Sequence, residues 1–260
     1  MWTKFKRIFE QIFAIVEADI RKLSHDPFEL LTRMIQPTVW LLIFGQAIAN
    51  AKAIPTGNLP YLDYMAPGVL AQSILFSSIF YGISLIWERD MGILQKILVT
   101  PAPRMALVIG RAIAAGIRGL PQFFMIYLLC FLMGIHLRFD LPALIGVFAM
   151  VILGAAVFST FSLMIASIVK KRERFIGIGQ VLTMPLFFAS NALYPIEIMP
   201  TWIRYLSFLN PLTYQVDTLR YLMIQGEKTT FGLFFNFSIE MLVLCLFVSI
   251  ATYIYPRILY

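Results

Sequence analysis

The sequence predicts an all-α protein that crosses a membrane several times. Of its 260 residues, 60% are hydrophobic and only 13% are charged, and its mean hydropathy is +0.80. A soluble domain of this length could not hide so much apolar surface in one core, so we expect lipid to surround much of the chain. A helix satisfies its backbone hydrogen bonds internally, which a segment surrounded by lipid requires.

The first 33 residues are charged and amphipathic, and residues 4–23 are expected to form a helix that lies in the membrane surface. The same spacing would suit a helix packed on a soluble core, but the rest of the chain offers no such core. The residue before Pro27 is disfavoured in helical backbone, which should end this helix. Its apolar stripe consists of Phe5, Ile8, Phe9, Ile12, Phe13, Val16, Ile20 and Leu23.

Six apolar stretches follow, and each has about the length that a helix needs to cross the hydrocarbon core. They are residues 34–50, 64–87, 106–134, 141–169, 175–193 and 231–255. An even number of spans places both termini on the same side. We therefore expect one transmembrane domain over residues 1–260, made of an interfacial segment (1–33), a six-span region (34–255) and a short tail (256–260).

The distribution of positive charge predicts the orientation. With the N-terminus inside, 15 Lys and Arg residues lie in cytoplasmic parts and 5 lie in outer loops. Cytoplasmic loops of membrane proteins carry such an excess, so both termini are expected in the cytoplasm, with the chain in the inner (plasma) membrane. The net charge of +7 would also suit nucleic-acid binding. No basic run interleaved with aromatics stands clear of the apolar stretches, so the predicted partner is membrane lipid and not nucleic acid.

Cysteine and histidine carry no sign of a metal or redox centre. Cys130 and Cys245 both lie inside apolar stretches, where cysteine behaves as a small hydrophobic residue. His25 and His136 are isolated, and no cluster of Cys, His or carboxylates has the spacing of metal ligands. We expect no metal site and no disulfide.

The outer segment 194–228 is too apolar to be a free loop and too broken to span. Pro195, Pro200 and Pro211 divide it, and we expect short helices that dip into the outer leaflet as a re-entrant segment. Irregular backbone at that depth survives only where protein or a water-filled cavity covers it.

The loop between the second and third stretches should form a short amphipathic helix. It begins with Glu88-Arg89-Asp90 and ends at Thr100-Pro101, and Met91, Leu94, Ile97 and Leu98 fall on one face. Such a helix suits docking in a groove on a partner. A helix resting on lipid headgroups would show the same pattern.

No ATP site is expected on this chain, which is therefore not predicted to be an enzyme by itself. A phosphate-binding loop needs Gly-x-x-x-x-Gly-Lys followed by Ser or Thr, so that backbone amides and a lysine meet the phosphates. The nearest fragment, at 226–228, lacks the first glycine, and Glu227 separates its glycine from its lysine. If ATP drives the function, another polypeptide must hydrolyse it.

Two charges lie inside the predicted spans. Arg118 lies seven residues past Arg111, roughly 10 Å deeper along a helix. It either extends back to the headgroups or faces a polar pathway. Glu240 lies roughly 13 Å into the last span and is either a protonated, hydrogen-bonded group or part of the mechanism. A cluster of Phe187, Phe188 and Tyr194 suits either an apolar substrate or the aromatic belt at the membrane surface.

Several of these features together resemble the permeases of ABC-2 type exporters. The resemblance covers nearly the whole chain: residues 25–27 (His-Asp-Pro), 66–68 (Ala-Pro-Gly), the loop 87–104 and above all residues 191–220. The amino-acid sequence of that last segment is most similar to the drug-resistance branch of the family, of the daunorubicin-exporter type. Its outer-gate residues would be Asn191, Tyr194, Pro195, Pro200, Trp202, Asn210 and Pro211.

The resemblance implies the membrane subunit of an ATP-driven exporter that works by alternating access. Its partners would be two ABC ATPase subunits, which hold ATP and Mg²⁺, and a second copy of itself or a related permease. The substrate would be an amphipathic drug, a lipid-linked molecule or a glycan. Spans one and five would line the dimer interface, which places Gln36, Thr38, Gln46, Ser190 and Asn191 near the path. The residues that couple to the ATPase would be Glu88, Arg89, Asp90, Gly92, Leu94, Ile97, Leu98, Thr100 and Pro101.

Two other functions stay open. A secondary transporter driven by an ion gradient could use Arg118 and Glu240 as a relay, but such transporters more often show repeated halves and broken helices at mid-membrane. A non-transporting membrane scaffold would account for the cytoplasmic docking helix and not for the re-entrant outer segment.

Overall fold

The computed structural model describes residues 2–255 except 26, 53, 58, 100–102 and 170, and its account of side chains leaves out residues 2–8, 22–31 and 98. In this part of the chain every named element is helical, and an isolated bridge joins Leu137 to Ile224. The helices are α1 (Trp2–His25), α2 (Pro27–Val39), the π-helical η1 (Trp40–Gly45), α3 (Gln46–Ala51), α4 (Tyr61–Asp90), α5 (Ile93–Val99), α6 (Arg104–Leu132), α7 (Leu141–Ile168), α8 (Arg172–Phe188), the 3₁₀ turn η2 (Ile196–Ile198), α9 (Thr201–Leu209), α10 (Pro211–Met223) and α11 (Leu233–Ile254).

Four of the described helices are long and apolar enough to cross a membrane: α4, α6, α7 and α11. They coincide with the second, third, fourth and sixth predicted stretches. The all-α class is therefore confirmed, and these four helices agree with a membrane location.

The other two predicted stretches have different structures. Residues 34–50 are helical, but they pass through the π-helical section η1 between α2 and α3. Helix α8 ends at Phe188, and turns follow it, so the fifth stretch stops short of residue 193. Its end is fixed locally, because the Ser190 hydroxyl donates to the carbonyl of Phe187 at 2.7 Å. Neither segment is among the four helices above, so the count of six spans stays a prediction.

Helix α7 lies at the centre of the bundle and packs along α4, α6, α10 and α11. It carries no charged residue and is apolar on all sides, as is typical of a helix that is surrounded by other helices or lipid. Helix α8 packs mainly on α4.

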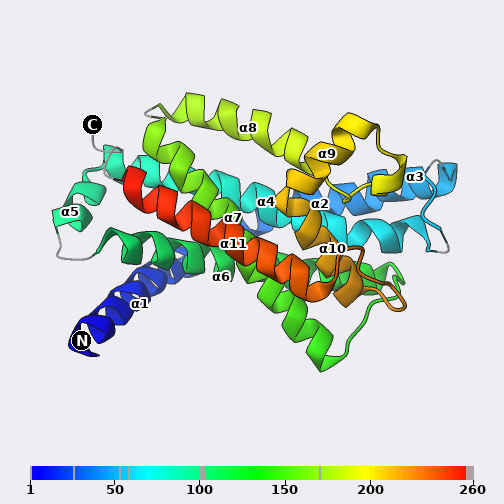
Figure 1. Cartoon of the computed structure of the whole chain (residues 1–260), viewed down its shortest axis with the longest axis horizontal. Helices are drawn as coiled ribbons and strands as arrows, with labels where there is room; N and C mark the ends of the chain where they lie inside the picture. The colour runs from blue at the N-terminus through cyan, green and yellow to red at the C-terminus, as the bar shows by residue number, and fades with distance from the viewer. Residues whose placement is uncertain are drawn as a thin grey trace.

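The two ends of the bundle are distinct (Figure 1). Helix α5, the start of α1 and the end of α11 lie at one end, which we call the α5 end; α3 and α9 lie at the other, the α9 end. Helix α1 packs along α6, with Ile15 over Gly110. Its outward side exposes Phe9 and Phe13. Its predicted place in the membrane surface stays a prediction.

Candidate functional site

Helix α5 divides its apolar side chains between the bundle and the outside. Gly92, which links α4 to α5, has a φ of +70°, a backbone conformation that favours glycine. Leu94 is fully buried and packs in a cluster with residues of α4, α6, α7, α8 and α11, and Ile97 packs at the edge of that cluster. Met91 is 59% exposed and Val99 86% exposed. The face predicted for docking is therefore split: Leu94 points into the bundle, whereas Met91 points outward.

The predicted coupling residues before α5 differ in their surroundings. Glu88 is buried and forms an ion pair with Arg111, so it joins the end of α4 to the start of α6. Arg89 and Asp90 pair with each other at 2.8 Å near the surface. Nearby, the Arg172 guanidinium lies 4.6 Å from the centre of the Trp87 ring and ties the start of α8 to α4. Of the remaining coupling residues, Thr100, Pro101 and the side chain of Leu98 lie outside the described part of the chain.

Arg118 connects three helices inside the bundle. Its guanidinium lies 5.0 Å from the centre of the Tyr81 ring on α4, and its Nη2 donates to the carbonyl of Asp19 on α1 at 3.3 Å. The Tyr81 hydroxyl donates to the Asp19 carboxylate. Arg118 therefore contacts α1, a position that neither of the two sequence interpretations had specified.

The α9 end is organised around Arg220 of α10. Its Nη2 donates to the carbonyl of Asn191 at 2.7 Å, and its Nε donates to the carbonyl of Tyr64 at 3.3 Å. The Tyr64 hydroxyl also donates to the Asn191 carbonyl, at 3.2 Å. Arg220 thus joins α10 and α4 to the turn that follows α8.

That turn approaches α4 so closely that only glycine fits. A Cβ added to Gly68 would lie 2.2 Å from the backbone oxygen of Ala192 and 2.8 Å from its Cα. Beside this contact, the Tyr61 hydroxyl donates to the carbonyl of Leu193 at 3.2 Å. The backbone of residues 191–193 is therefore fixed against α4.

Asn210 and Pro211 form the start of α10. The Asn210 side chain accepts from the backbone N–H of Leu212 at 3.1 Å, which caps the helix, and Pro211 occupies the first helical position, where its missing N–H has no cost. The Asn210 amide also donates to the carbonyl of Leu186 at 2.6 Å. The start of α10 is thereby held against the end of α8.

The other predicted outer-gate residues lie at the edge of this assembly. Pro195 precedes η2 and Pro200 precedes α9, so the chain is divided at the predicted prolines. Trp202 is 66% exposed. The Tyr194 hydroxyl donates to the carbonyl of Phe188.

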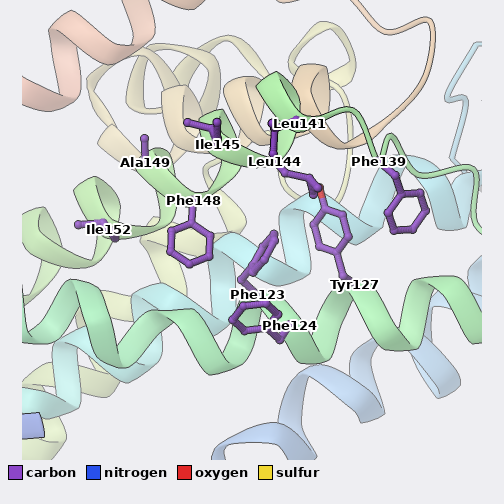
Figure 2. A pocket seen from close by; sticks show the side chains of 10 residues that line it. All are labelled: Phe123, Phe124, Tyr127, Phe139, Leu141, Leu144, Ile145, Phe148, Ala149 and Ile152. Atoms are coloured by element: carbon purple, nitrogen blue, oxygen red, sulfur yellow. The ribbon is translucent and has the colours of Figure 1, made fainter.

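An apolar groove lies between α6 and α7 (Figure 2). It measures about 660 Å³, and Phe123, Tyr127 and Phe148 line it together with other apolar residues. The aromatic cluster predicted from the sequence lies elsewhere, on α8 and the turn after it. There Phe187 is buried with its ring 5.5 Å from that of Trp40.

The profile of the ABC-2 type transporter family matches residues 10–224, which include α5 and the whole Arg220 assembly. The chain belongs to the ABC-2 transporter family. It is 28% identical over 260 residues to the transport permease ycf38 of Cyanophora paradoxa, covering 96% of this chain and 89% of that protein. It is 24% identical to the daunorubicin resistance ABC transporter permease DrrB1 of Streptomyces coeruleorubidus, over 77% of this chain and 70% of that one. The inner membrane transport permease YadH of Escherichia coli is 23% identical over 83% of this chain and 85% of its own.

In this ABC-2 protein the sequence interpretation missed residues that the fold brings together. Arg220 and Tyr64 bind the carbonyl of Asn191, and Gly68 lies against Ala192, but only Asn191 had been assigned to the outer gate. Asp217 was missed as well: it accepts from the backbone N–H of Thr230 at 3.0 Å and from the Asn236 side chain at 2.8 Å. The available signal was two charges, three residues apart, in an otherwise uncharged helix between apolar segments.

Proposed function

We propose that this chain is the membrane subunit of an ATP-driven exporter, with six spans and both termini in the cytoplasm. The α5 end, with the start of α1 and the end of α11, would then face the cytoplasm, in agreement with the excess of Lys and Arg in the loops assigned to that side. The two further spans would be the helical run 27–51 and α8 with the turn after it. At about 1.5 Å per residue, the run 27–51 is roughly 37 Å long, which exceeds the thickness of the hydrocarbon core.

The observation that carries this proposal is the division of α5 between two environments. Leu94 inserts among the ends of five helices, while Met91, Ile93 and Val99 face away from the bundle. An ATPase subunit bound to the outward face could move α5, and the buried Leu94 would pass that displacement to α4, α6 and α11. The buried ion pair between Glu88 and Arg111 connects the neighbouring ends of α4 and α6, so these ends would move together.

The segment from α9 to α10 would form the re-entrant outer gate. Leu222 packs on Gly146 and Gln215 packs on Gly154, so α10 runs antiparallel to α7. Gly154 lies thirteen residues into α7, about 20 Å from its start. Helix α10 therefore begins deep in the bundle and returns toward the α9 end, which supports a hairpin that enters and leaves on the same side.

A second copy of the chain would complete the pathway. The run 27–51 and α8 both expose apolar residues that no described part of the chain covers, among them Ile35, Val39, Ile43, Val181 and Met184. We propose that these two surfaces meet in a dimer, with Gln36 and Gln46 beside the path. The substrate would be an amphipathic drug-like or lipid-linked molecule, for which the similarity to a daunorubicin resistance permease is the support.

The test is purification in a mild detergent followed by mass spectrometry of bound proteins and by reconstitution into liposomes. We expect an ATPase with a phosphate-binding loop to copurify in equal amount, and export of a daunorubicin-like fluorescent amphiphile to require ATP. A chain that purifies alone, with transport that follows an imposed ion gradient instead of ATP, would overturn the proposal in favour of a secondary transporter. Absence of transport under either condition would favour a scaffold.

A further inference from the structure

Glu240 of α11 is a fully buried carboxyl group whose two oxygens have no hydrogen-bond partner in the described part of the protein. Three other buried side chains on α10 and α11 have polar atoms without such a partner. They are Gln215, at both ends of its amide, Thr218, at its hydroxyl, and Asn236, at its Oδ1. Buried polar atoms in proteins are nearly always hydrogen-bonded, to protein or to ordered water. Four such side chains on two neighbouring helices therefore need an explanation.

The contact between α7 and α11 fixes the position of Glu240. The rings of Phe161 and Phe247 are stacked with their centres 5.3 Å apart, and the two helices run in the same direction (Figure 1). Seven residues make about two helical turns and return to the same face. Glu240, seven residues before Phe247, therefore lies on the side of α11 toward α7, at about the level of Gly154, seven residues before Phe161.

Helix α10 brings Gln215 to the same place. A Cβ added to Gly154 would lie 2.2 Å from the amide nitrogen of Gln215, so the missing side chain of Gly154 leaves the room that this amide occupies. The hydrogen bond between Asp217 and Asn236 gives an independent register, because Asn236 lies one turn before Glu240 and Asp217 lies two residues after Gln215. Both contacts place Glu240 and Gln215 within about one helical turn of each other.

The helices that pack on α11 offer Glu240 no counter-charge. Helix α7 has no titratable side chain. On α10, Asp217 accepts from Asn236 and Thr230, and Arg220 binds two backbone carbonyls. On α6, Arg104 is exposed at the first residue of the helix, Arg111 pairs with Glu88, and Arg118 binds Asp19 and Tyr81. The other titratable side chains of α10 and α11, and of α6 beyond Arg118, are tyrosines and cysteines, which cannot carry a positive charge: Tyr127, Cys130, Tyr214, Tyr221, Cys245 and Tyr253.

We propose that Glu240 binds a proton and shares ordered internal water with Gln215 and Thr218, in a polar site that fastens α10 to α7 and α11. A carboxylic acid, an amide and a hydroxyl each donate and accept, so bridging water can satisfy all three. An ionised carboxylate in the same place would be costly without a partner. Glu240 lies beyond residues 10–224, so the family match does not include it.

The first test is infrared spectroscopy of the whole protein in lipid nanodiscs at neutral pH. We expect the carbonyl band of a buried protonated carboxylic acid, present in the wild type and in Glu197→Gln, which changes an exposed carboxylate, and absent in Glu240→Gln. This isostere keeps the hydrogen-bonding capacity and should fold. A wild-type spectrum without that band, or a band that disappears when Na⁺ is added, would overturn the proposal. The second result would indicate a cation site.

A double-mutant cycle tests whether the groups share one site. Glu240→Leu and Gln215→Leu should each lower the melting temperature, and the double variant should lose less than the sum of the two losses. The matched control pairs Gln215→Leu with Ser249→Ala, an exposed residue on α11, and should be additive. Additivity in the first pair would overturn the shared site. Neither measurement uses transport or ATPase activity, so this proposal and the proposed function can fail separately.

Discussion

Arg220 stacks on the ring of Tyr64, with its guanidinium carbon 3.7 Å from the ring centre, while its Nε donates to the backbone carbonyl of the same tyrosine. Arg220 of α10 thereby contacts both the backbone and the side chain of Tyr64 on α4. Its Nη2 donates to the carbonyl of Asn191, so three segments far apart in the sequence meet at one guanidinium.

Replacing Arg220 should separate these segments. A lysine cannot stack and donate to two carbonyls at once, because its ammonium is a point charge on a flexible stem. We expect Arg220→Lys to be impaired, and Arg220→Ala to be destabilised by about 2–3 kcal/mol and to lose transport. Thermal unfolding and liposome transport would measure both effects. Arg138→Ala, which removes a surface pair with Asp140 and a contact with the Tyr221 ring, is the control and should lose little stability and keep transport; an Arg220→Ala variant that matched it would show that the Arg220 contact is dispensable.

The contact between Gly68 and Ala192 predicts a steric effect of a single methyl group. Gly68→Ala should force the turn away from α4, because the added Cβ would meet backbone atoms, which cannot rotate aside. We expect loss of transport and a lower melting temperature. Gly177→Ala, on α8, is the matched control: nothing lies within 4 Å of its added Cβ, and alanine gains roughly 1 kcal/mol over glycine in a helix. Equal behaviour of the two variants would argue against close packing at Gly68.

The two sides of α5 should respond differently to charge. Leu94→Asp would bury a carboxylate among apolar helix ends, so we expect a large loss of stability and low yield. Val99→Asp lies on the exposed side and should leave the melting temperature unchanged while weakening the copurification of the ATPase and its stimulation by substrate. Wild-type stimulation of hydrolysis in a Val99→Asp, Met91→Asp double variant would place the ATPase contact elsewhere.

The ion pair between Glu88 and Arg111 should be costly to break from one side. Glu88→Gln or Arg111→Gln leaves one buried charge without its partner, at an expected cost of about 3–5 kcal/mol. Glu88→Gln combined with Arg111→Gln should cost less than the two single changes together, since neither charge then remains. Neutralising Asp90, whose pair with Arg89 is exposed, should cost no more than about 1 kcal/mol. Thermal unfolding of the four variants would decide, and additive single changes would contradict a direct pair.

The sequence was sufficient to predict helices α4, α6, α7 and α11, because a long apolar run predicts a helix of membrane-spanning length whether lipid or other helices surround it. It also predicted the short helix α5 and the divisions at Pro195, Pro200 and Pro211, since proline acts on local backbone. These features depend on residues that are close together in the chain, and such local patterns are visible in a single sequence.

What the sequence did not reveal depends on contacts between distant segments. The spacing of Met91 and Leu94 predicts that they share a helical face. Which of the two side chains is buried in the bundle depends on the direction that the turn at Gly92 gives to α5. Arg220 could be seen as an unusual charge, yet its partners on α4 and at Asn191 lie 156 and 29 residues away. The contact of Arg118 with α1 was equally hidden, because nothing in the amphipathic pattern of α1 indicates that it packs along α6.

The contacts of Asp19 with Tyr81 and Arg118 set how much of the N-terminal helix the folded protein can lose. A chain that began after Asp19 would lose the carbonyl that Arg118 binds and the carboxylate that accepts from Tyr81. The boundary between dispensable and required sequence should therefore fall inside α1, before Ile15, which packs over Gly110. Fusion proteins or affinity tags at the N-terminus should leave the chain intact from that residue onward.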